Sequence, residues 1–441
     1  MFKKTFKGGV HPDDGKRYAK DASYRTYLPQ GELVFPMSQH IGKPAKPLVK
    51  KGDTVLAGQL IGEADGFVSA NIVSSCSGTV KAVENRRIAS GAKVMSVVIE
   101  NDGQYTLAEG IGAERDYKTL GKEEILGSIQ KAGIVGMGGA GFPVHVKLAP
   151  KNADEIRYII ANGAECEPYI TSDDRLLRET PERVLEGLRI LLRIFGLDKG
   201  YIGIEANKKT AISILQEKCP AGGDIVVQVL KTRYPQGAEK QLIQTVTGRQ
   251  VPPGGLPAAV GCGVFNAATC AAIYDAVYLG MPLVQRGVTV TGEAIKNPKN
   301  FIAPIGTPFA DLIEAAGGFV SDPYKVLTGG PMMGMTQFDL SVPVIKGTNA
   351  VTCFTQKQRV EAKTPHCIRC GRCVGVCPMH LMPLYLYQAE RRDNVDELNR
   401  RNITDCIECG SCAYICPARI PLVQSFKNGK AKVKAASAKK N

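Results

Sequence analysis

The sequence predicts a multidomain α/β protein: a small β sandwich first, then a Rossmann-like α/β domain, a second small β domain and a helical, cysteine-rich domain. Three observations predict this order. The 441 residues, 44% of them hydrophobic, exceed what a single core usually organises. Strand-like runs broken by glycine turns come first, and alternating strand and helix patterns follow. Two cysteine runs separated by a helical pattern lie near the end of the chain.

Residues 1–110 are expected to form an N-terminal arm and a small β sandwich. Short strand-like runs over residues 31–100 are separated by Gly-Asp, Ala-Gly and Ser-Gly turns. This pattern resembles the biotinyl/lipoyl barrel fold. The hairpin that holds the modified lysine in such carriers reads Ala64-Asp65-Gly66-Phe67 here, which offers no amine to acylate. We therefore expect a scaffold.

Residues 111–299 are expected to form an α/β domain with a mostly parallel sheet. Its first long helix carries its own boundary signals, because Thr180 can cap it, Pro181 takes the first helical position and Gly196 stands at the exit. The predicted strands are residues 158–160, 201–205 and 224–230, and the predicted helices are Pro181–Phe195 and Lys209–Lys218.

Residues 300–352 are expected to form a small β-rich domain before the cysteine runs. The segment resembles the soluble-ligand-binding β-grasp domain. A ligand site and a purely structural role are both compatible with this pattern.

Eight cysteines give the clearest chemical signal in the chain. Each run places three cysteines at three-residue steps and a fourth four residues later, before a proline. In the two-cluster [4Fe-4S] pattern, three thiolates come from one run and the fourth crosses to the other cluster. Zinc would use two thiolate pairs per ion, and a disulfide framework would not need this spacing, so both are disfavoured. The expected ligand sets are Cys367, Cys370, Cys373 and Cys416 for one cluster, and Cys406, Cys409, Cys412 and Cys377 for the other.

The segment between the two runs reads as helix, turn, helix, because apolar residues recur at three- and four-residue steps. Residues 353–426 are therefore expected to form a helical ferredoxin domain. Residues 427–441 form a lysine-rich tail. A solvated, disordered tail and a tail attracted to an anionic membrane or an acidic redox partner are both compatible with this composition.

Composition excludes several classes of protein. The segment MFKKTFKGGV lacks an apolar signal sequence, and the eight cluster thiols require a reducing compartment. Prolines and glycines interrupt the longest uncharged stretch, residues 251–274, so we expect no membrane-spanning segment. The formal net charge of +14 overstates the charge of the loaded protein, because eight cysteinate ligands on two clusters bring negative charge that the count omits. No aromatic-interleaved basic motif indicates nucleic acid.

A glycine-rich loop follows a predicted helix at residues 123–132. Gly136, Gly138 and Gly141 match G-x-G-x-x-G, but that fingerprint requires a strand before it and a helix after it. A backbone with few Cβ atoms can still lie against a planar ring or a phosphate. Lys147 follows as a candidate phosphate partner. A bare glycine turn is the alternative.

Several longer motifs occur in a recognisable order. GMGGAGFPVHVKL, NGAECEP, YPQGAEK and VFNAATC resemble the NADH-binding flavoprotein subunit of respiratory complex I. GGVHP, QHIGKPAKP, ANGAECEP, VTGRQVPPGGLP and the paired cluster motifs more closely resemble the RnfC family, the C subunits of the Rnf complex, which is the ion-translocating ferredoxin:NAD oxidoreductase. The resemblance extends from residue 1 to about residue 425.

The resemblance implies that residues 111–299 form an FMN- and NAD-binding domain and that two [4Fe-4S] clusters, non-covalent FMN and NAD(H) take part. It assigns Gly136, Gly138, Gly139 and Gly141 to the flavin and nicotinamide site, Asn162, Glu165, Gly237 and Glu239 to the flavin, Asn266 and Thr269 to its phosphate, and Phe142, Lys147 and Glu167 to the dinucleotide. The chain departs from the complex I pattern at Ala164, Cys166, Ala238 and Phe265.

The implied function is an electron-transfer subunit that links NAD(H), FMN and two clusters while its complex couples ferredoxin oxidation to NAD reduction and ion translocation. The implied partners are the other Rnf subunits and, indirectly, ferredoxin. The implied location is peripheral, on the cytoplasmic face of the membrane. One alternative is a flavin-dependent cobalamin reductase of a bacterial microcompartment, against which the stretch FKGGVHPDDGKRYAKD argues. The other is a noncatalytic iron-sulfur relay subunit.

Overall fold

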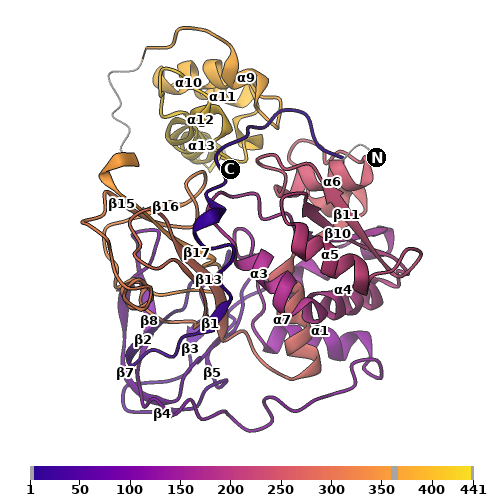
Figure 1. Cartoon of the computed structure of the whole chain (residues 1–441), viewed down its shortest axis with the longest axis vertical. Helices are drawn as coiled ribbons and strands as arrows, with labels where there is room; N and C mark the ends of the chain where they lie inside the picture. Colours follow the sequence, from indigo (N-terminus) through magenta and orange to yellow (C-terminus); the bar gives the residue numbers. More distant parts are fainter. Residues whose placement is uncertain (1–3, 359–365, 439–441) are drawn as a thin grey trace.

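A computed structural model describes residues 4–358 and 366–438. Three β-containing regions form the body of the molecule, and a cluster of helices, α9 to α13, sits at one end of it (Figure 1). This confirms the predicted multidomain α/β class. Within the described residues, no helix is long and apolar enough to cross a bilayer.

The first region is a β sandwich, as predicted. Its larger sheet has the order β2-β8-β7-β4 and its smaller sheet the order β3-β5-β6. Side chains of β7 alternate between buried and exposed at its start, which places one face of the sheet in the core. The strands are β2 Gly31–Pro36, β3 Lys46–Pro47, β4 Thr54–Val55, β5 Leu60–Glu63, β6 Ile72–Val73, β7 Gly78–Arg87 and β8 Lys93–Asn101.

The second region contains a four-stranded sheet of order β11-β10-β9-β12, in which every pairing is parallel. Helices α4 and α7 share the large core on one face, and α6 packs its apolar side chains against the other face. The strands are β9 Tyr158–Gly163, β10 Gly200–Glu205, β11 Ile225–Leu230 and β12 Cys262–Asn266, and the helices are α1 Lys122–Lys131, α2 Val144–Lys147, α3 Ser172–Glu179, α4 Pro181–Phe195, α5 Lys209–Lys218, α6 Glu239–Thr247 and α7 Ala267–Tyr278.

Helix α4 tests the boundary signals. Pro181 occupies the first helical position, and Gly196 ends the helix with a left-handed φ of 64°. The expectation for Thr180 was wrong, because its side chain makes no capping hydrogen bond within the described part of the chain. Thr180 also ends α3, so one residue serves as the junction between two helices.

The third region is a six-stranded sheet of order β1-β14-β13-β17-β15-β16. Strand β13 precedes residue 300 yet pairs with both β14 and β17, so this sheet begins earlier in the chain than the predicted β-grasp domain. Its helix is α8 Phe309–Ala315. The strands are β1 Tyr24–Thr26, β13 Gln285–Thr291, β14 Lys299–Pro304, β15 Lys325–Thr328, β16 Met335–Gln337 and β17 Ala350–Phe354.

The cysteine-rich region is helical, as predicted. The helix-turn-helix between the runs is α10 followed by α11, and both pack against the last helix. Much of the basic tail lies in this last helix, whose Leu422, Phe426 and Val433 are buried in the domain core. The helices are α9 Arg372–Gly375, α10 Pro383–Arg391, α11 Val395–Arg400, α12 Ser411–Tyr414 and α13 Leu422–Ala438.

The N-terminal arm connects the regions. Lys4 forms a parallel bridge with Leu230 at the end of β11. Gly9 donates its N–H to the carbonyl of Val376 (2.8 Å) in the ferredoxin domain. Strand β1 then pairs with β14 in the six-stranded sheet. The indigo segment in Figure 1 follows this course.

Candidate functional site

The eight predicted cluster cysteines divide between two cavities in the helical domain. The outer cavity is lined by Cys367, Cys370, Cys373 and Cys416. The inner cavity is lined by Cys377, Cys406, Cys409 and Cys412. Each cavity thus combines three cysteines of one run with the proline-preceding cysteine of the other, which is the division expected from the two-cluster pattern.

The two cysteine runs have matching backbone turns. Arg369 and Glu408, each one residue before the second cysteine of its run, both have φ of 55°. The glycines after those cysteines, Gly371 and Gly410, have φ of 73° and 80°. Left-handed residues turn the chain tightly, so successive peptide groups of each run curve around its cavity. Within the described residues no group of His, Cys, Asp or Glu side chains lies close enough together to hold a metal ion. In each cavity the four cysteines instead line a space between them.

The surroundings of the two cavities differ. In the outer cavity Cys367 and Cys370 are exposed, and the neighbouring Ile368 is 67% exposed. In the inner cavity Cys377, Cys409 and Cys412 are buried. Ile407, which corresponds to Ile368, packs instead with Val10, Tyr234 and Cys409. The inner cavity therefore faces the body of the protein, and the outer cavity faces solvent.

Tyr234 connects the inner cavity with the parallel-sheet domain. Its buried hydroxyl donates a hydrogen bond to the carbonyl oxygen of Cys409 (2.7 Å). The backbone of Tyr234 exchanges two hydrogen bonds with Val10 of the arm (2.8 and 3.0 Å). Tyr234 was not among the residues predicted from the sequence to have a role, although it begins the YPQGAEK motif. A buried tyrosine needs a hydroxyl partner, but the sequence does not reveal which one.

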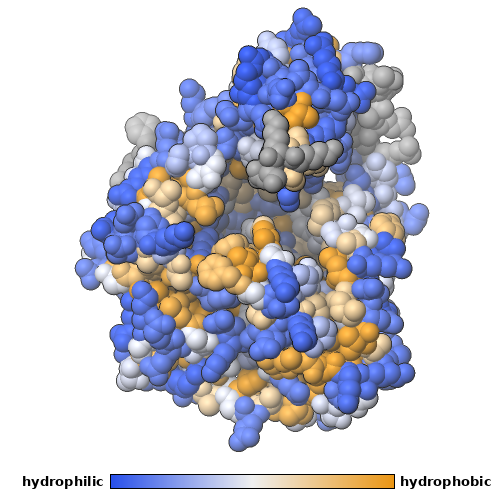
Figure 2. All heavy atoms as spheres, turned by 180° about the vertical axis from the view of Figure 1, so that it is seen from behind, coloured by the Kyte–Doolittle hydropathy of each residue, from blue (hydrophilic) through white to orange (hydrophobic). Residues whose placement is uncertain are grey.

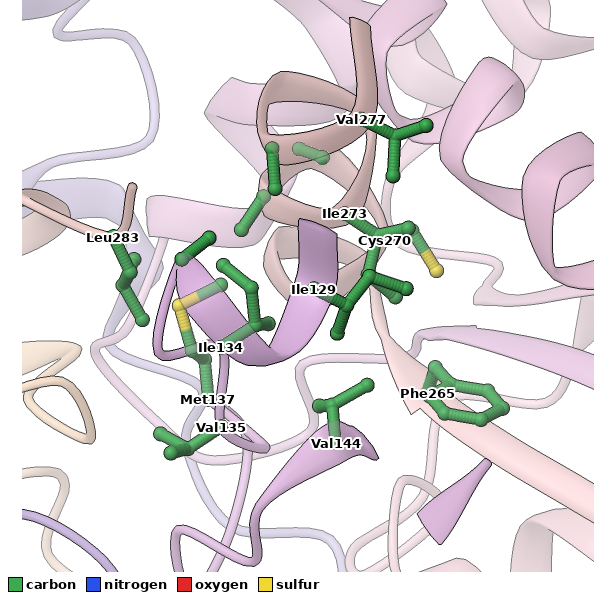
Figure 3. Close-up of a cluster of buried hydrophobic side chains, with 14 of the residues drawn as sticks. Ile129, Ile134, Val135, Met137, Val144, Phe265, Cys270, Ile273, Val277 and Leu283 are labelled. Atoms are coloured by element: carbon green, nitrogen blue, oxygen red, sulfur yellow. The ribbon is translucent and has the colours of Figure 1, made fainter. Parts of the chain in front are cut away.

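The glycine loop lies between α1 and α2. Gly136 donates to the carbonyl of Phe142 (2.9 Å), and Val135 pairs with Pro143, so the loop folds back on itself. The loop is therefore not the strand-to-helix turn of the dinucleotide fingerprint. This agrees with its sequence context, in which a predicted helix and not a strand precedes the glycines. Val135 and Met137 belong to the buried core cluster, and Figure 3 shows Met137 beside Ile134, so these two side chains anchor the loop.

The loop approaches the end of strand β12. Met137 donates its N–H to Thr269 Oγ1 (3.0 Å). A Cβ on Gly138 would lie 2.9 Å from Cβ of Asn266, so only glycine fits there. A Cβ on Gly139, in contrast, would meet no described atom within 4 Å. The loop thus presents bare backbone beside the residues assigned to the phosphate.

Asn162 and Asn266 mark the carboxyl ends of neighbouring parallel strands, where they stand in register. Asn266 caps α7 by accepting hydrogen bonds from the N–H groups of Ala268 (2.9 Å) and Thr269 (3.3 Å). Asn162 donates to the carbonyl of Gly237 (2.8 Å). Ligands of parallel sheets commonly bind outside the carboxyl ends of the strands. The structure therefore brings Asn162, Gly237, Asn266 and Thr269 to one edge of the sheet.

Glu165 is buried beside this edge in a strained backbone conformation, with φ of 43°. Its Oε1 accepts the N–H of Asp173 (2.6 Å), and its Oε2 lies 3.7 Å from Nζ of buried Lys16. Burial raises the pKa of Glu165 to about 7, while Lys16 and Lys208 oppose the shift. Oε2 has no hydrogen-bond partner among the residues that the structure describes.

The three residues assigned to the dinucleotide differ in exposure and in their hydrogen-bond and ion-pair partners. Phe142 is 37% exposed. Lys147 forms an ion pair with Glu239 (2.8 Å), which joins a residue assigned to the dinucleotide with one assigned to the flavin. Glu167 is mostly buried, and its Oε1 accepts the N–H groups of Met332 (2.7 Å) and Met333 (3.1 Å). The Glu167 carboxylate thus contacts the loop between β15 and β16.

Cys166 lies between the flavin-assigned residues and the inner cavity. Gly237 donates its N–H to the Cys166 sulfur (3.2 Å), and burial raises the pKa of this thiol far above its usual range. It packs with Tyr234 and Cys409. The remaining cysteines, Cys76, Cys219, Cys262, Cys270 and Cys353, are buried and pack as small apolar side chains. From behind, the molecular surface is hollowed beneath the ferredoxin domain (Figure 2).

Comparison with known families accounts for the domain order. Four family models match successive segments. They are the RnfC barrel sandwich hybrid domain at residues 4–104, the Nuo51 FMN-binding domain at 129–275, the SLBB domain at 288–336 and the 4Fe-4S dicluster domain at 359–417.

Curated relatives match nearly the whole chain. The C subunit of the proton-translocating ferredoxin:NAD(+) oxidoreductase complex of Clostridium ljungdahlii is 47% identical, with 98% of this chain and 95% of the relative covered. The Na(+)-translocating counterpart of Acetobacterium woodii is 46% identical, with 99% of each chain covered. The C subunit of the ion-translocating oxidoreductase complex of Rhodobacter capsulatus is 42% identical, with 99% of this chain and 85% of the relative covered.

A solved NAD+-reducing [NiFe]-hydrogenase in the H2-reduced state is 20% identical, with 73% of this chain and 62% of that chain covered and a TM-score of 0.48.

The matched domains define an iron-sulfur flavoprotein with an FMN-binding domain and a two-cluster domain. More specifically, the chain belongs to the RnfC family, the C subunits of the ion-translocating ferredoxin:NAD(+) oxidoreductase (Rnf) complexes.

Proposed function

We propose that this protein is the NAD(H)-interacting electron-transfer subunit of an ion-translocating ferredoxin:NAD oxidoreductase complex. The observation that carries the proposal is the arrangement of the two cysteine cavities, of which the inner one contacts the flavin-assigned domain through Tyr234 and the outer one faces solvent. Such an arrangement suits electron transfer between a buried flavin and an external acceptor or donor. The names of the curated relatives agree with this function.

The residues at the sheet edge fit FMN. Gly139 offers open backbone, and Asn162 and Asn266 lie beside it with amides held in place by Gly237 and Asp173. Glu165 has a buried Oε2 without a hydrogen-bond partner among the described residues. Bound FMN would exchange two electrons with NAD(H) and single electrons with the clusters. The protein's own residues would orient the ring, exclude water and hold charge beside it. The proposed flavin site comprises Gly136, Gly138, Gly139, Gly141, Asn162, Glu165, Gly237, Glu239, Asn266 and Thr269.

For the dinucleotide we propose Phe142 as the stacking residue and Lys147 as the phosphate partner. The half-exposed position of Phe142 supports the first role. The Lys147–Glu239 ion pair would have to open or share its cation when a phosphate binds. Glu167 holds the N–H groups of Met332 and Met333 through Oε1, so its Oε2 would be the oxygen that accepts ribose hydroxyl groups.

The cysteine sets that line the two cavities are proposed as the cluster ligands. Cys406, Cys409, Cys412 and Cys377 would hold the cluster nearer the flavin, and Cys367, Cys370, Cys373 and Cys416 the cluster at the surface. Electrons would then pass between flavin, inner cluster and outer cluster in series. The direction of flow depends on the relative potentials of the three groups.

The proposed partners are the other subunits of the complex, with ferredoxin acting through them. The names of the curated relatives, each a subunit of a complex, support this assignment. We further propose a peripheral position on the cytoplasmic face of the membrane. One relative is named as a subunit of a proton-translocating complex and another of a Na(+)-translocating one, so the coupling ion differs between the complexes of these relatives.

The test is an anaerobic titration of the protein reconstituted with FMN, iron and sulfide. Addition of NADH should bleach the flavin absorption and produce EPR signals of reduced clusters. A protein that keeps its clusters but retains no flavin and does not respond to NADH would contradict the proposal and favour a noncatalytic relay. Reduction of a corrinoid by the isolated protein would favour the cobalamin reductase alternative.

A further inference from the structure

Lys430, on helix α13, reaches the backbone of the inner cavity. Its Nζ donates to the carbonyl oxygen of Cys406 (2.5 Å) and to Oε1 of Glu408 (2.7 Å). Both charged side chains are about a quarter exposed, so solvent screens their charges only in part. Glu408 also lines the inner cavity. A cation and a carboxylate are therefore held side by side at the rim of one cluster site.

A second lysine on the same helix provides a natural contrast. Lys432 forms ion pairs with Glu390 (2.9 Å) and Asp393, at the end of α10 and in the turn after it. Neither carboxylate lines a cysteine cavity. Lys430 and Lys432 thus have the same chemistry and lie two residues apart on α13, on different sides of the helix. Of the two, only Lys430 contacts a cysteine of the inner run.

The outer run carries the opposite charge at the matching position. Arg369 stands where the inner run has Glu408, with the same φ of 55°. Arg369 also lines its own cavity. The two cavities thus share a backbone turn while the charge at the rim differs.

We propose that Lys430 and Glu408 tune the reduction potential of the cluster held in the inner cavity, with Lys430 raising it and Glu408 lowering it. Reduction adds one electron, supplied by an external donor, and so makes the cluster more negative. A nearby cation stabilises that added charge and a nearby carboxylate destabilises it. The proposal rests on the cluster ligands proposed above, but it does not depend on NAD(H) binding.

The experiment is an anaerobic redox titration with mediators, followed by EPR, on the reconstituted full-length protein. Lys430→Met should lower the midpoint potential of one cluster, because it removes the cation and leaves Glu408 unpaired. Glu408→Gln should raise the same potential. The double variant should fall between the single variants. Lys432→Met is the matched control, which removes an ion-paired lysine of α13 and should leave both cluster potentials unchanged.

Three results would overturn the proposal: single variants that shift the potential in the same direction, single variants that shift neither potential, or a Lys432→Met shift equal to that of Lys430→Met. Iron content is measured in every variant. If Lys430→Met loses iron, Lys430→Arg and Glu408→Gln decide the matter, with a potential near wild type expected for the first and a raised potential for the second. Loss of inner-cluster iron in all of these variants would show a purely structural role. Absence of clusters in the wild-type protein would instead refute the proposed ligand sets, and a failed NADH response with intact clusters would refute only the proposed function.

Discussion

The inner and outer cysteine cavities are built on the same sequence pattern but differ in what surrounds them. Both use a left-handed residue before the second cysteine and a left-handed glycine after it. The inner cavity is enclosed by the arm, Tyr234 and Ile407, whereas the outer cavity leaves Cys367, Cys370 and Ile368 exposed. The difference teaches that the same cysteine spacing can line a buried or an exposed cavity, and that packing from other parts of the chain decides which.

The largest expected effect comes from the two proline-preceding cysteines. Cys377→Ser should remove the cluster of the inner cavity although Cys377 belongs to the first run, and Cys416→Ser should remove the outer one. Each variant should lose about half of the bound iron, because each cluster needs four thiolates. Iron analysis and EPR of the remaining cluster measure this.

The two variants also check each other. With Cys377→Ser, NADH should still bleach the flavin but electrons should no longer reach the outer cluster. If Cys377→Ser instead spared the cluster held by Cys406, Cys409 and Cys412, the crossed ligand assignment would be wrong.

A smaller effect is expected from the matched isoleucines. Ile407→Ala removes a side chain packed with Val10 and Tyr234, and should destabilise the loaded protein by about 2 kcal/mol. Ile368→Ala, at the corresponding exposed position, should change stability by less than about 0.5 kcal/mol. Thermal unfolding of the two variants in parallel gives the comparison. Equal losses would mean that the inner cavity is not more enclosed than the outer one.

The smallest effect is expected from Tyr234→Phe. The change keeps the buried ring but leaves the carbonyl of Cys409 without its donor, which should cost about 1 kcal/mol. It should also make the inner cluster more sensitive to oxygen, since the contact between domains is weakened, while the outer cluster should be unaffected. The rate of cluster bleaching in air measures this, and wild-type behaviour at both clusters would argue against a sealing role for Tyr234.

Local signals in the sequence predicted much of the fold. Helix α4 begins at Pro181 and ends before Gly196 because those residues determine a boundary by backbone geometry alone. Strand β13 was harder to place, because its partners β14 and β17 follow it in the chain and a strand's sheet depends on distant pairing. The basic tail was ambiguous for a related reason. Its lysines suggested a solvated segment, while the buried Leu422 and Phe426 bind α13 to the domain core.

The candidate site also has features that the sequence predicted and contacts that it did not. Cysteine spacing predicted which thiols share a cavity, because the repeated pattern combines three cysteines of one run with the proline-preceding cysteine of the other. The contact of Glu167 with Met332 and Met333, and that of Tyr234 with Cys409, join segments far apart in the sequence. The sequence contains no local signal for such contacts.

The arm has a consequence for how the chain is made. Residues 4–26 are synthesised well before Leu230, Tyr234, Asn300 and Val376, with which they pair. Contacts of such long sequence separation form slowly, so the arm must wait unpaired through most of translation. The arm would then bind between the sheet edge and the helical domain late in folding. An arm in its final position would indicate that the cysteine-rich domain has already folded.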